Sequence, residues 1–217
     1  AELNFLDGVP DATHLAVPGK LAGTNFTNSL LIGHSTTGTL NNANLNTGVG
    51  IQALDALTSG DSNTALGYAS ASLINSGVQN TAIGDGSLPN VTNTMSNVGV
   101  GYQAGKNGTG NRNIYIGENA GRHHSSGNGK VIIGGGDLGT TGNTSSRVLE
   151  IHGYDGSTRT TWITGDSSGN LTFPAEVAAV SLDISGNVDV DGTLETDALS
   201  IASTAVTSTA AELNILD

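Results

Sequence analysis

The stretch NTALGYASASLINSGVQNTAIG, residues 63–84, contains one motif twice and thereby decides the fold. Each copy reads Asn, Thr, a small residue, an aliphatic residue and Gly, and the two glycines, Gly67 and Gly84, are 17 residues apart. Self-similarity at a short fixed period is the sequence signature of repeat architectures. The stretch therefore predicts a stack of equivalent rungs rather than a compact globular core.

The motif recurs in both directions from this stretch. Seven rungs align on glycine, with steps of 17, 17, 17, 17, 16 and 17 residues. They read SLLIG (29–33), NTGVG (46–50), NTALG (63–67), NTAIG (80–84), NVGVG (97–101), NIYIG (113–117) and KVIIG (130–134). A degenerate eighth rung, RVLEI (147–151), follows, in which Ile151 takes the place of the glycine.

A rung of about 17 residues is too short for a helix, a strand and two turns, so we expect one coil of two short strands per rung. Stacking would pair each strand in register with its copies at about 4.8 Å, and seven rungs would extend roughly 30 Å. The predicted fold class is all-β, with a parallel β-solenoid (β-roll) of seven to eight rungs over residues 28–151.

Three columns of the rung have predicted structural roles. The repeated glycine permits positive φ at a tight corner. The asparagine tolerates turn conformations, and a stacked column of asparagines can form a ladder of side-chain amide hydrogen bonds. The aliphatic residue before each glycine is predicted to form the core. The ladder residues are Asn46, Asn63, Asn80, Asn97 and Asn113, the glycines Gly33, Gly50, Gly67, Gly84, Gly101, Gly117 and Gly134, and the aliphatic residues Ile32, Val49, Leu66, Ile83, Val100, Ile116 and Ile133.

The middle strand position is occupied by small residues in the central rungs, such as Gly48, Ala65 and Ala82. Because one aliphatic column covers itself only marginally and this second face carries no charge, we expect the Gly/Ala face to meet another chain. Close approach around a shared axis needs small residues, which favours an intertwined homotrimer. A self-sufficient monomeric solenoid is the alternative.

Composition agrees with an elongated stack that has a thin interior. Glycine is 32 of 217 residues, while charged residues are 12% and aromatic residues 4%, so little large apolar surface is available for a compact core. The net charge of −12 disfavours nucleic acid and anionic membrane surfaces as partners. Without cysteine there is no disulfide framework or thiolate zinc site, and we expect no cofactor. We also expect no membrane insertion, because no apolar run approaches about 20 residues.

Residues 152–210 are predicted to form a β-rich shaft. Short alternating runs at 170–173, 181–184 and 187–190 are separated by Gly or Asp, as is typical of short strands with tight turns. The only tryptophan, Trp162, is in this region. We expect Trp162 to anchor the shaft by plugging the end of the solenoid, and a sugar-stacking role is the alternative.

The two ends of the chain match each other, with AELNFLDG at residues 1–8 and AELNILD at residues 211–217. In both copies two leucines are at positions i and i+3, which predicts one short helical turn. Residues 1–27 are predicted to be an N-terminal linker, and residues 211–217 repeat its first segment. We therefore expect the chain to be one module of a longer repetitive protein.

The sequence gives little support for a metal site. His123 and His124 are adjacent, so in a strand they would point to opposite faces; we expect a surface turn, and a metal site on a trimer axis is the alternative. Four shaft aspartates lack both EF-hand spacing and the calcium β-helix nonapeptide, so we expect solvated turn acids. These residues are Asp183, Asp189, Asp191 and Asp197.

No catalytic constellation emerges either. The acids of the ladder region are at scattered turn positions and give no carboxylate pair for a glycosidase. These acids are Asp55, Asp61, Asp85 and Glu118. The threonine column of Thr47, Thr64 and Thr81 lasts three rungs and then turns aliphatic, which predicts a buried face rather than an ice-binding array.

The motifs NTALGY, NTAIGDGSL, NVGVGYQAG and NIYIGENAG within residues 46–121 resemble the β-roll repeats of phage tail fibres and, more distantly, the heads of trimeric autotransporter adhesins. The stretch SLDISGNVDVDGTLETDALSIASTAVTSTAAELNILD, residues 181–217, resembles shaft repeats of tail-fibre and other structural proteins of marine phages, cyanophages especially. The rungs of the adhesin heads are shorter than these, which favours the phage family. The resemblance implies an extracellular trimeric fibre, rich in parallel β-structure, that reaches towards a host surface.

We therefore expect a structural, non-catalytic module of a phage tail fibre or virion appendage that serves host attachment. Its expected partners are further copies or modules of the same fibre, with weak multivalent contacts to host-surface glycan. The alternative is a bacterial extracellular adhesin or filament subunit. A carbohydrate-cleaving depolymerase on the same scaffold is the third possibility.

Overall fold

The computed structural model describes residues 19–34, 36–136, 148–155, 157–179, 184–185, 187–191, 200–201 and 204–207. All regular secondary structure in these ranges is β-strand. The chain divides into two units, Ala1–Val177 and Ala178–Asp217. The matched ends and the helical turns expected in them lie outside the described residues, as do Asp183 and Asp197.

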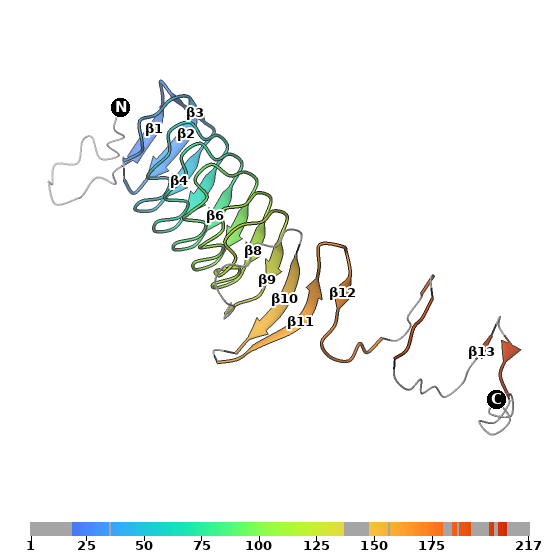
Figure 1. Ribbon diagram of the computed structural model, residues 1–217. Coiled ribbons are helices and arrows are strands. Elements are labelled where there is room, and N and C mark those ends of the chain that lie inside the picture. The colour runs from blue at the N-terminus through green and yellow to red at the C-terminus, as the bar shows by residue number, and fades with distance from the viewer. Residues whose placement is uncertain are drawn as a thin grey trace. The chain divides into compact units, whose positions relative to one another are not determined.

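Among the described residues, the first unit contains twelve strands of one sheet, and the second contains a separate pair (Figure 1). The strands are β1 (Gly19–Gly23), β2 (Phe26–Ile32), β3 (Ala43–Asn44), β4 (Thr47–Val49), β5 (Thr64–Leu66), β6 (Thr81–Ile83), β7 (Val98–Val100), β8 (Ile114–Ile116), β9 (Val131–Ile133), β10 (Leu149–Tyr154), β11 (Arg159–Gly165), β12 (Leu171–Thr172), β13 (Ser200–Ile201) and β14 (Thr204–Ala205).

Strands β4 to β9 form a parallel ladder in which each rung contributes one strand, and the intervening loops coil along one side of it (Figure 1). Equivalent residues of neighbouring rungs lie opposite each other, for example Leu66 and Ile83. The predicted parallel β-solenoid of about seven turns is therefore confirmed. The register follows from the period, because only a shift by a whole rung superimposes every column on itself.

From β4 to β9 each coil contains one regular strand instead of the two that we expected. A second pairing occurs among the described residues only where β3 lies beside β2 and at the isolated bridge between Val78 and Met95. The residue before each ladder asparagine has a left-handed backbone, as in Gln79 (φ 59°) and Ser96 (φ 58°). Further left-handed residues follow the corner glycines, such as Ala69 (φ 50°) and Ala71 (φ 48°). Left-handed residues interrupt extended segments, so the second side of the coil is mostly turn.

The strands face the opposite way from our expectation. The middle residue of each strand points into the coil, and Ala65 and Ala82 are at most 1% exposed. The aliphatic residue before the glycine, predicted to be the core, faces outward: Leu66 is 48% exposed and Ile83 36%. In the same column Ile116 and Ile133 are exposed, and Ile32, Val49 and Val100 are half-buried.

The reversal has a steric cause, because large side chains from the turns already fill the coil. Leu54, Leu57, Ile74, Leu88 and Val91 are all at most 1% exposed and belong to the core cluster. A strand residue that shares this narrow interior must be small.

The interior stays densely packed because a large side chain in one rung lies next to a small residue in a neighbouring rung. A Cβ added to Gly48 would lie 2.4 Å from the Leu31 side chain. Tyr115 is the large exception among the inward strand residues of the middle rungs, and it is 1% exposed. Two glycines make room for its ring, since a Cβ on Gly105 or Gly121 would lie 2.5 or 2.1 Å from a ring carbon.

The corner glycines are constrained twice. All seven have positive φ, between 106° and 133°. A Cβ on Gly84 would also lie 2.5 Å from the carbonyl oxygen of Gly101 in the next rung. The close approach of successive rungs at this corner therefore requires glycine independently of the dihedral angle.

Antiparallel strands flank the solenoid at both ends. At the N-terminal end β1 pairs with β2, so part of the predicted linker belongs to the sheet. At the C-terminal end β10 pairs in parallel with β9 and then antiparallel with β11. The eighth rung is thus present, but its alignment was wrong by one residue: Ile151 lies opposite Ile133 instead of replacing the glycine, and Glu150 lies opposite the buried Ile132.

In the region predicted to be a shaft, few of the described residues form strands. Strand β12 pairs with the end of β11, and the run at 187–190 is exposed and forms no strand. In the second unit β13 and β14 form a short antiparallel pair in which Ser200 lies opposite Ala205.

Candidate interaction surfaces

The five ladder asparagines are at most 1% exposed and form a continuous polar column inside the coil. The Nδ2 group of Asn63 donates to Oδ1 of Asn46 (3.0 Å), and the backbone N–H of Asn63 donates to the same oxygen (3.0 Å). Asn63 also donates through Nδ2 to the carbonyl of Gly77 (2.8 Å). Each rung therefore satisfies the buried amide of the rung before it, which ties successive rungs together.

Other residues terminate this column at each end. At the first rung the hydroxyl of Ser29 accepts the backbone N–H of Asn46 (2.8 Å). At the last rung Lys130 takes the asparagine position, and its backbone N–H donates to Oδ1 of Asn113 (2.9 Å). The Lys130 side chain is fully buried, and its Nζ donates to the carbonyl of Ser126.

The outward strand face is the set of first and third residues of strands β4 to β9. It has no charged side chain, and six strands at about 4.8 Å extend it over roughly 25 Å. Contiguous apolar patches of this kind are seldom left exposed on monomeric proteins. The residues are Thr47, Val49, Thr64, Leu66, Thr81, Ile83, Val98, Val100, Ile114, Ile116, Val131 and Ile133.

The structure contradicts two predictions about the faces of the sheet. The Gly/Ala face that we expected to meet another chain is the closed interior, where Gly48 and Gly99 are buried. The threonine column expected to be buried is part of the outward strand face, with Thr47 and Thr64 exposed. Both corrections follow from the turn leucines and isoleucines that fill the coil.

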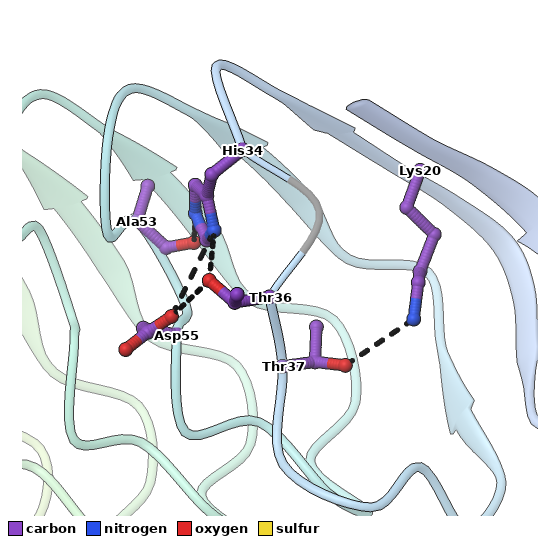
Figure 2. Close-up of polar contacts among 6 residues, drawn as sticks. All are labelled: Lys20, His34, Thr36, Thr37, Ala53 and Asp55. Atoms are coloured by element: carbon purple, nitrogen blue, oxygen red, sulfur yellow. Dashed lines mark hydrogen bonds and ion pairs between the residues drawn. The ribbon is translucent and has the colours of Figure 1, made fainter. Parts of the chain in front are cut away.

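A histidine, a hydroxyl and a carboxylate meet beside the first corner (Figure 2). Nδ1 of His34 lies 2.8 Å from the hydroxyl of Thr36 and 3.8 Å from Oδ1 of Asp55. Thr36 in turn donates its hydroxyl to Asp55. Nε2 of His34 donates to the carbonyl oxygen of Ala53 (2.8 Å), because a carbonyl can only accept.

This arrangement differs from a nucleophile activated by histidine and carboxylate. In a catalytic triad one imidazole nitrogen faces the carboxylate and the other faces the hydroxyl. In this cluster a single nitrogen of His34 faces both Thr36 and Asp55, and a backbone carbonyl occupies the other nitrogen. The cluster joins the first two rungs. The nearby bond from Nζ of Lys20 to the hydroxyl of Thr37 (3.3 Å) joins β1 to the turn of the first rung (Figure 2).

The remaining acids of the ladder region are dispersed. Asp61 accepts the backbone N–H of Asn44 (2.7 Å), which is 17 residues away, and so links two successive rungs. Asp85 and Glu118 are exposed and each follows a corner glycine. Asp189 and Asp191 are exposed as well.

A charged cluster occupies the C-terminal end of the solenoid, and sequence reasoning missed it. Nε2 of His124 lies 3.5 Å from Oε1 of Glu150, and the guanidinium of Arg159 lies 3.7 Å from Oε2 of the same carboxylate. Burial lowers the pKa of Lys130 to about 8, and the negative charge of Glu150 partly opposes this shift. The signal that could have revealed the cluster is the replacement of the ladder asparagine by lysine in the last rung.

The surface turn predicted for His123 and His124 is wrong for His124. That residue is 4% exposed, because it takes the inward position that Leu57 and Ile74 hold in earlier rungs. His123 is half-buried. Within the described ranges, no group of three His, Asp or Glu side chains is arranged to hold a metal ion.

The role predicted for Trp162 is also wrong. Trp162 does not plug the solenoid: it is 57% exposed and lies on the open face of β11. The buried aromatic side chain at this end of the ladder is that of His152 in β10, which lies beside Gly134.

The part of the chain that the structure describes contains no helix that could span a bilayer. Comparison with protein-family models, with curated proteins and with solved structures found no match to this chain.

Proposed function

We propose that this chain is a structural, non-catalytic module of a phage tail fibre or virion appendage that provides reach for host attachment. The observation that carries the proposal is the asparagine column, in which every buried amide is satisfied by the neighbouring rung. A chain held together rung by rung suits a rigid spacer, because its length grows with the number of rungs. The resemblance of residues 181–217 to the shaft repeats of marine phages supports the same role.

The functional unit is a homotrimer in which copies of the chain meet through the outward strand face. With a net charge of −12, identical chains repel one another except where they approach through uncharged surface. The outward strand face supplies such a surface. In every copy of the chain its side chains repeat at the same spacing from strand to strand. Burial of exposed side chains such as Leu66 and Ile83 would stabilise the assembly.

The non-catalytic role is supported by the clusters of polar side chains. Asp55 and His34 are engaged with Thr36 and Ala53 in a contact between rungs. Glu150 is engaged by His124 and Arg159 at the end of the solenoid. In both places the polar side chains are engaged with one another.

Negative-stain electron microscopy of the full chain tests the proposed architecture. Rods are expected, and compact globules of single-chain size would contradict the proposal. The genes beside the coding sequence test the biological assignment. Neighbouring tail genes agree with a virion fibre, whereas a secretion anchor would favour a bacterial adhesin or filament subunit.

A further inference from the structure

The hairpin of β10 and β11 contains a hollow on the side where Trp162 is exposed. Its volume is about 370 Å³, which is within the range of small-ligand sites. Both strands and the turn between them contribute to its walls. The lining residues are Gly153, Tyr154, Asp155, Thr158, Thr160 and Trp162.

The indole of Trp162 packs against Gly153 of the neighbouring strand. A Cβ added to Gly153 would lie 2.8 Å from Cζ2 and 3.0 Å from Cη2 of the indole. The bare Cα of Gly153 therefore lets the ring rest against β10. Trp162 nevertheless stays 57% exposed, so the ring offers apolar surface to a ligand in the hollow.

The polar side chains of the hollow have hydrogen-bonding capacity left. Oδ1 of Asp155 accepts the backbone N–H groups of Ser157 (2.8 Å) and Thr158 (2.7 Å), which holds the turn. These bonds lower the pKa of Asp155, so its carboxylate is ionised at neutral pH. Among the described contacts, Oδ2 of Asp155 and the hydroxyls of Thr158 and Thr160 have no protein partner, so they can bind a ligand.

We propose that this hollow binds an uncharged saccharide ring. The apolar C–H face of a pyranose matches the face of an indole, and its hydroxyls match a carboxylate and two threonine hydroxyls. Asp155 and the net charge of −12 disfavour anionic sugars and phosphate. The inference deepens the proposed function, on which its biological role rests, by naming the ligand class for host attachment.

Weak single-site binding is sufficient for such a role. A shallow, partly open hollow with one aromatic ring suggests a dissociation constant on the order of 1 mM. Three copies on one fibre, and many fibres on one particle, would raise the apparent affinity through effective concentration.

Tryptophan fluorescence tests the site directly, because Trp162 is the only tryptophan in the chain. The full chain is titrated with methyl glycosides of glucose, galactose and mannose. A saturable change in emission is expected with at least one of them. Sorbitol, which is open-chain and lacks a pyranose face, and glucuronate, which is anionic, are expected to give no saturable change.

Variants separate the site from general surface effects, with binding measured by saturation-transfer NMR. Trp162→Ala is expected to abolish the transfer signal, and Thr160→Val to weaken binding several-fold. Both side chains are exposed, so both variants should fold, and circular dichroism checks this. Tyr102→Ala, which removes an exposed aromatic ring from the solenoid, should bind like the wild type.

Three results would overturn the saccharide site. They are no response to any of the three glycosides, an equal response to sorbitol, and a transfer signal that survives Trp162→Ala. Shielding of Trp162 from acrylamide without any sugar response would show that another copy of the chain covers the hollow. A trimer that binds no sugar overturns this inference alone, whereas a monomer that binds sugar overturns only the proposed trimer.

Discussion

Asn63 donates its side-chain amide to the side-chain oxygen of Asn46 over 3.0 Å, although the two residues are 17 positions apart in the chain. The same bond joins Asn80 to Asn63 (3.1 Å) and Asn97 to Asn80 (3.0 Å). Each of these oxygens also accepts a backbone N–H from the next rung. The stability of a rung is therefore set largely by its neighbours, as in other repeat proteins.

Replacing one ladder asparagine should strongly destabilise the protein. Asn80→Ala removes the acceptor of the Asn97 backbone N–H and one of the two acceptors of its Nδ2, and Oδ1 of Asn63 loses an amide donor. Each buried polar group left unsatisfied costs about 1–3 kcal/mol. We expect the free energy of unfolding to fall by roughly 3 kcal/mol or more in urea denaturation.

The matched control is Asn93→Ala. Asn93 is exposed and accepts one bond, from the hydroxyl of Ser76 (2.9 Å). The change should stay within about 0.5 kcal/mol of wild type. Equal effects of the two substitutions would contradict the role of the buried column.

The corner glycines should not tolerate even alanine. Gly84→Ala places a Cβ 2.5 Å from the carbonyl oxygen of Gly101 and leaves alanine at φ 124°. Strain of about 1–3 kcal/mol is expected from the backbone alone, and the steric clash adds to it. Thermal unfolding should shift well below that of wild type. Gly23→Ala is the control, since its added Cβ would meet nothing within 4 Å, and an equal loss there would contradict the account.

The buried lysine at the end of the column should give a distinct pH dependence. Burial lowers the pKa of Lys130 to about 8 in the folded chain, against 10.5 for an unperturbed lysine. Between these values the unfolded chain holds a proton that the folded chain has lost, so stability rises with pH through this window. Below about pH 8 both states are protonated and the contribution is constant.

Lys130→Asn should remove this rise, because asparagine does not titrate and continues the ladder. The measurement is the unfolding midpoint in urea at pH 7.5 and at pH 9.5, for wild type and variant. Lys106→Asn, at a half-buried lysine outside the column, should keep the wild-type pH dependence. If the Lys130→Asn midpoint rises with pH as much as the wild-type midpoint, Lys130 is not the responsible group.

The period of the chain was sufficient to predict the solenoid, but not the direction of its side chains. A three-residue strand such as Thr64–Leu66 alternates in the same way whichever face is buried, so the strand motif alone gives two solutions. The turns decide between them: Leu54, Ile74 and Leu88 fill the coil and leave room only for Ala65 and its equivalents. Those turn residues vary between rungs, so a motif-based alignment gives them little weight.

The end of the solenoid was less predictable, because the pattern there is degenerate. A shift of one residue in β10 directs Glu150 towards the interior, where it meets His124 and Arg159. The position of Trp162 depends on the register of the β10 and β11 hairpin, which contains an irregularity between Ile151 and His152. Local sequence carries no clear signal for either feature.

The most direct test of the account is the mass of the assembly in solution, measured by light scattering during size exclusion. The wild-type chain is expected at three times the 21.7 kDa of one chain. The double variant Leu66→Lys and Ile83→Lys, which charges the outward strand face, is expected at the mass of one chain with unchanged circular dichroism. Tyr68→Lys, at an exposed corner residue, should keep the wild-type mass. A wild-type chain of single-chain mass, or a double variant that remains trimeric, would contradict association through this face.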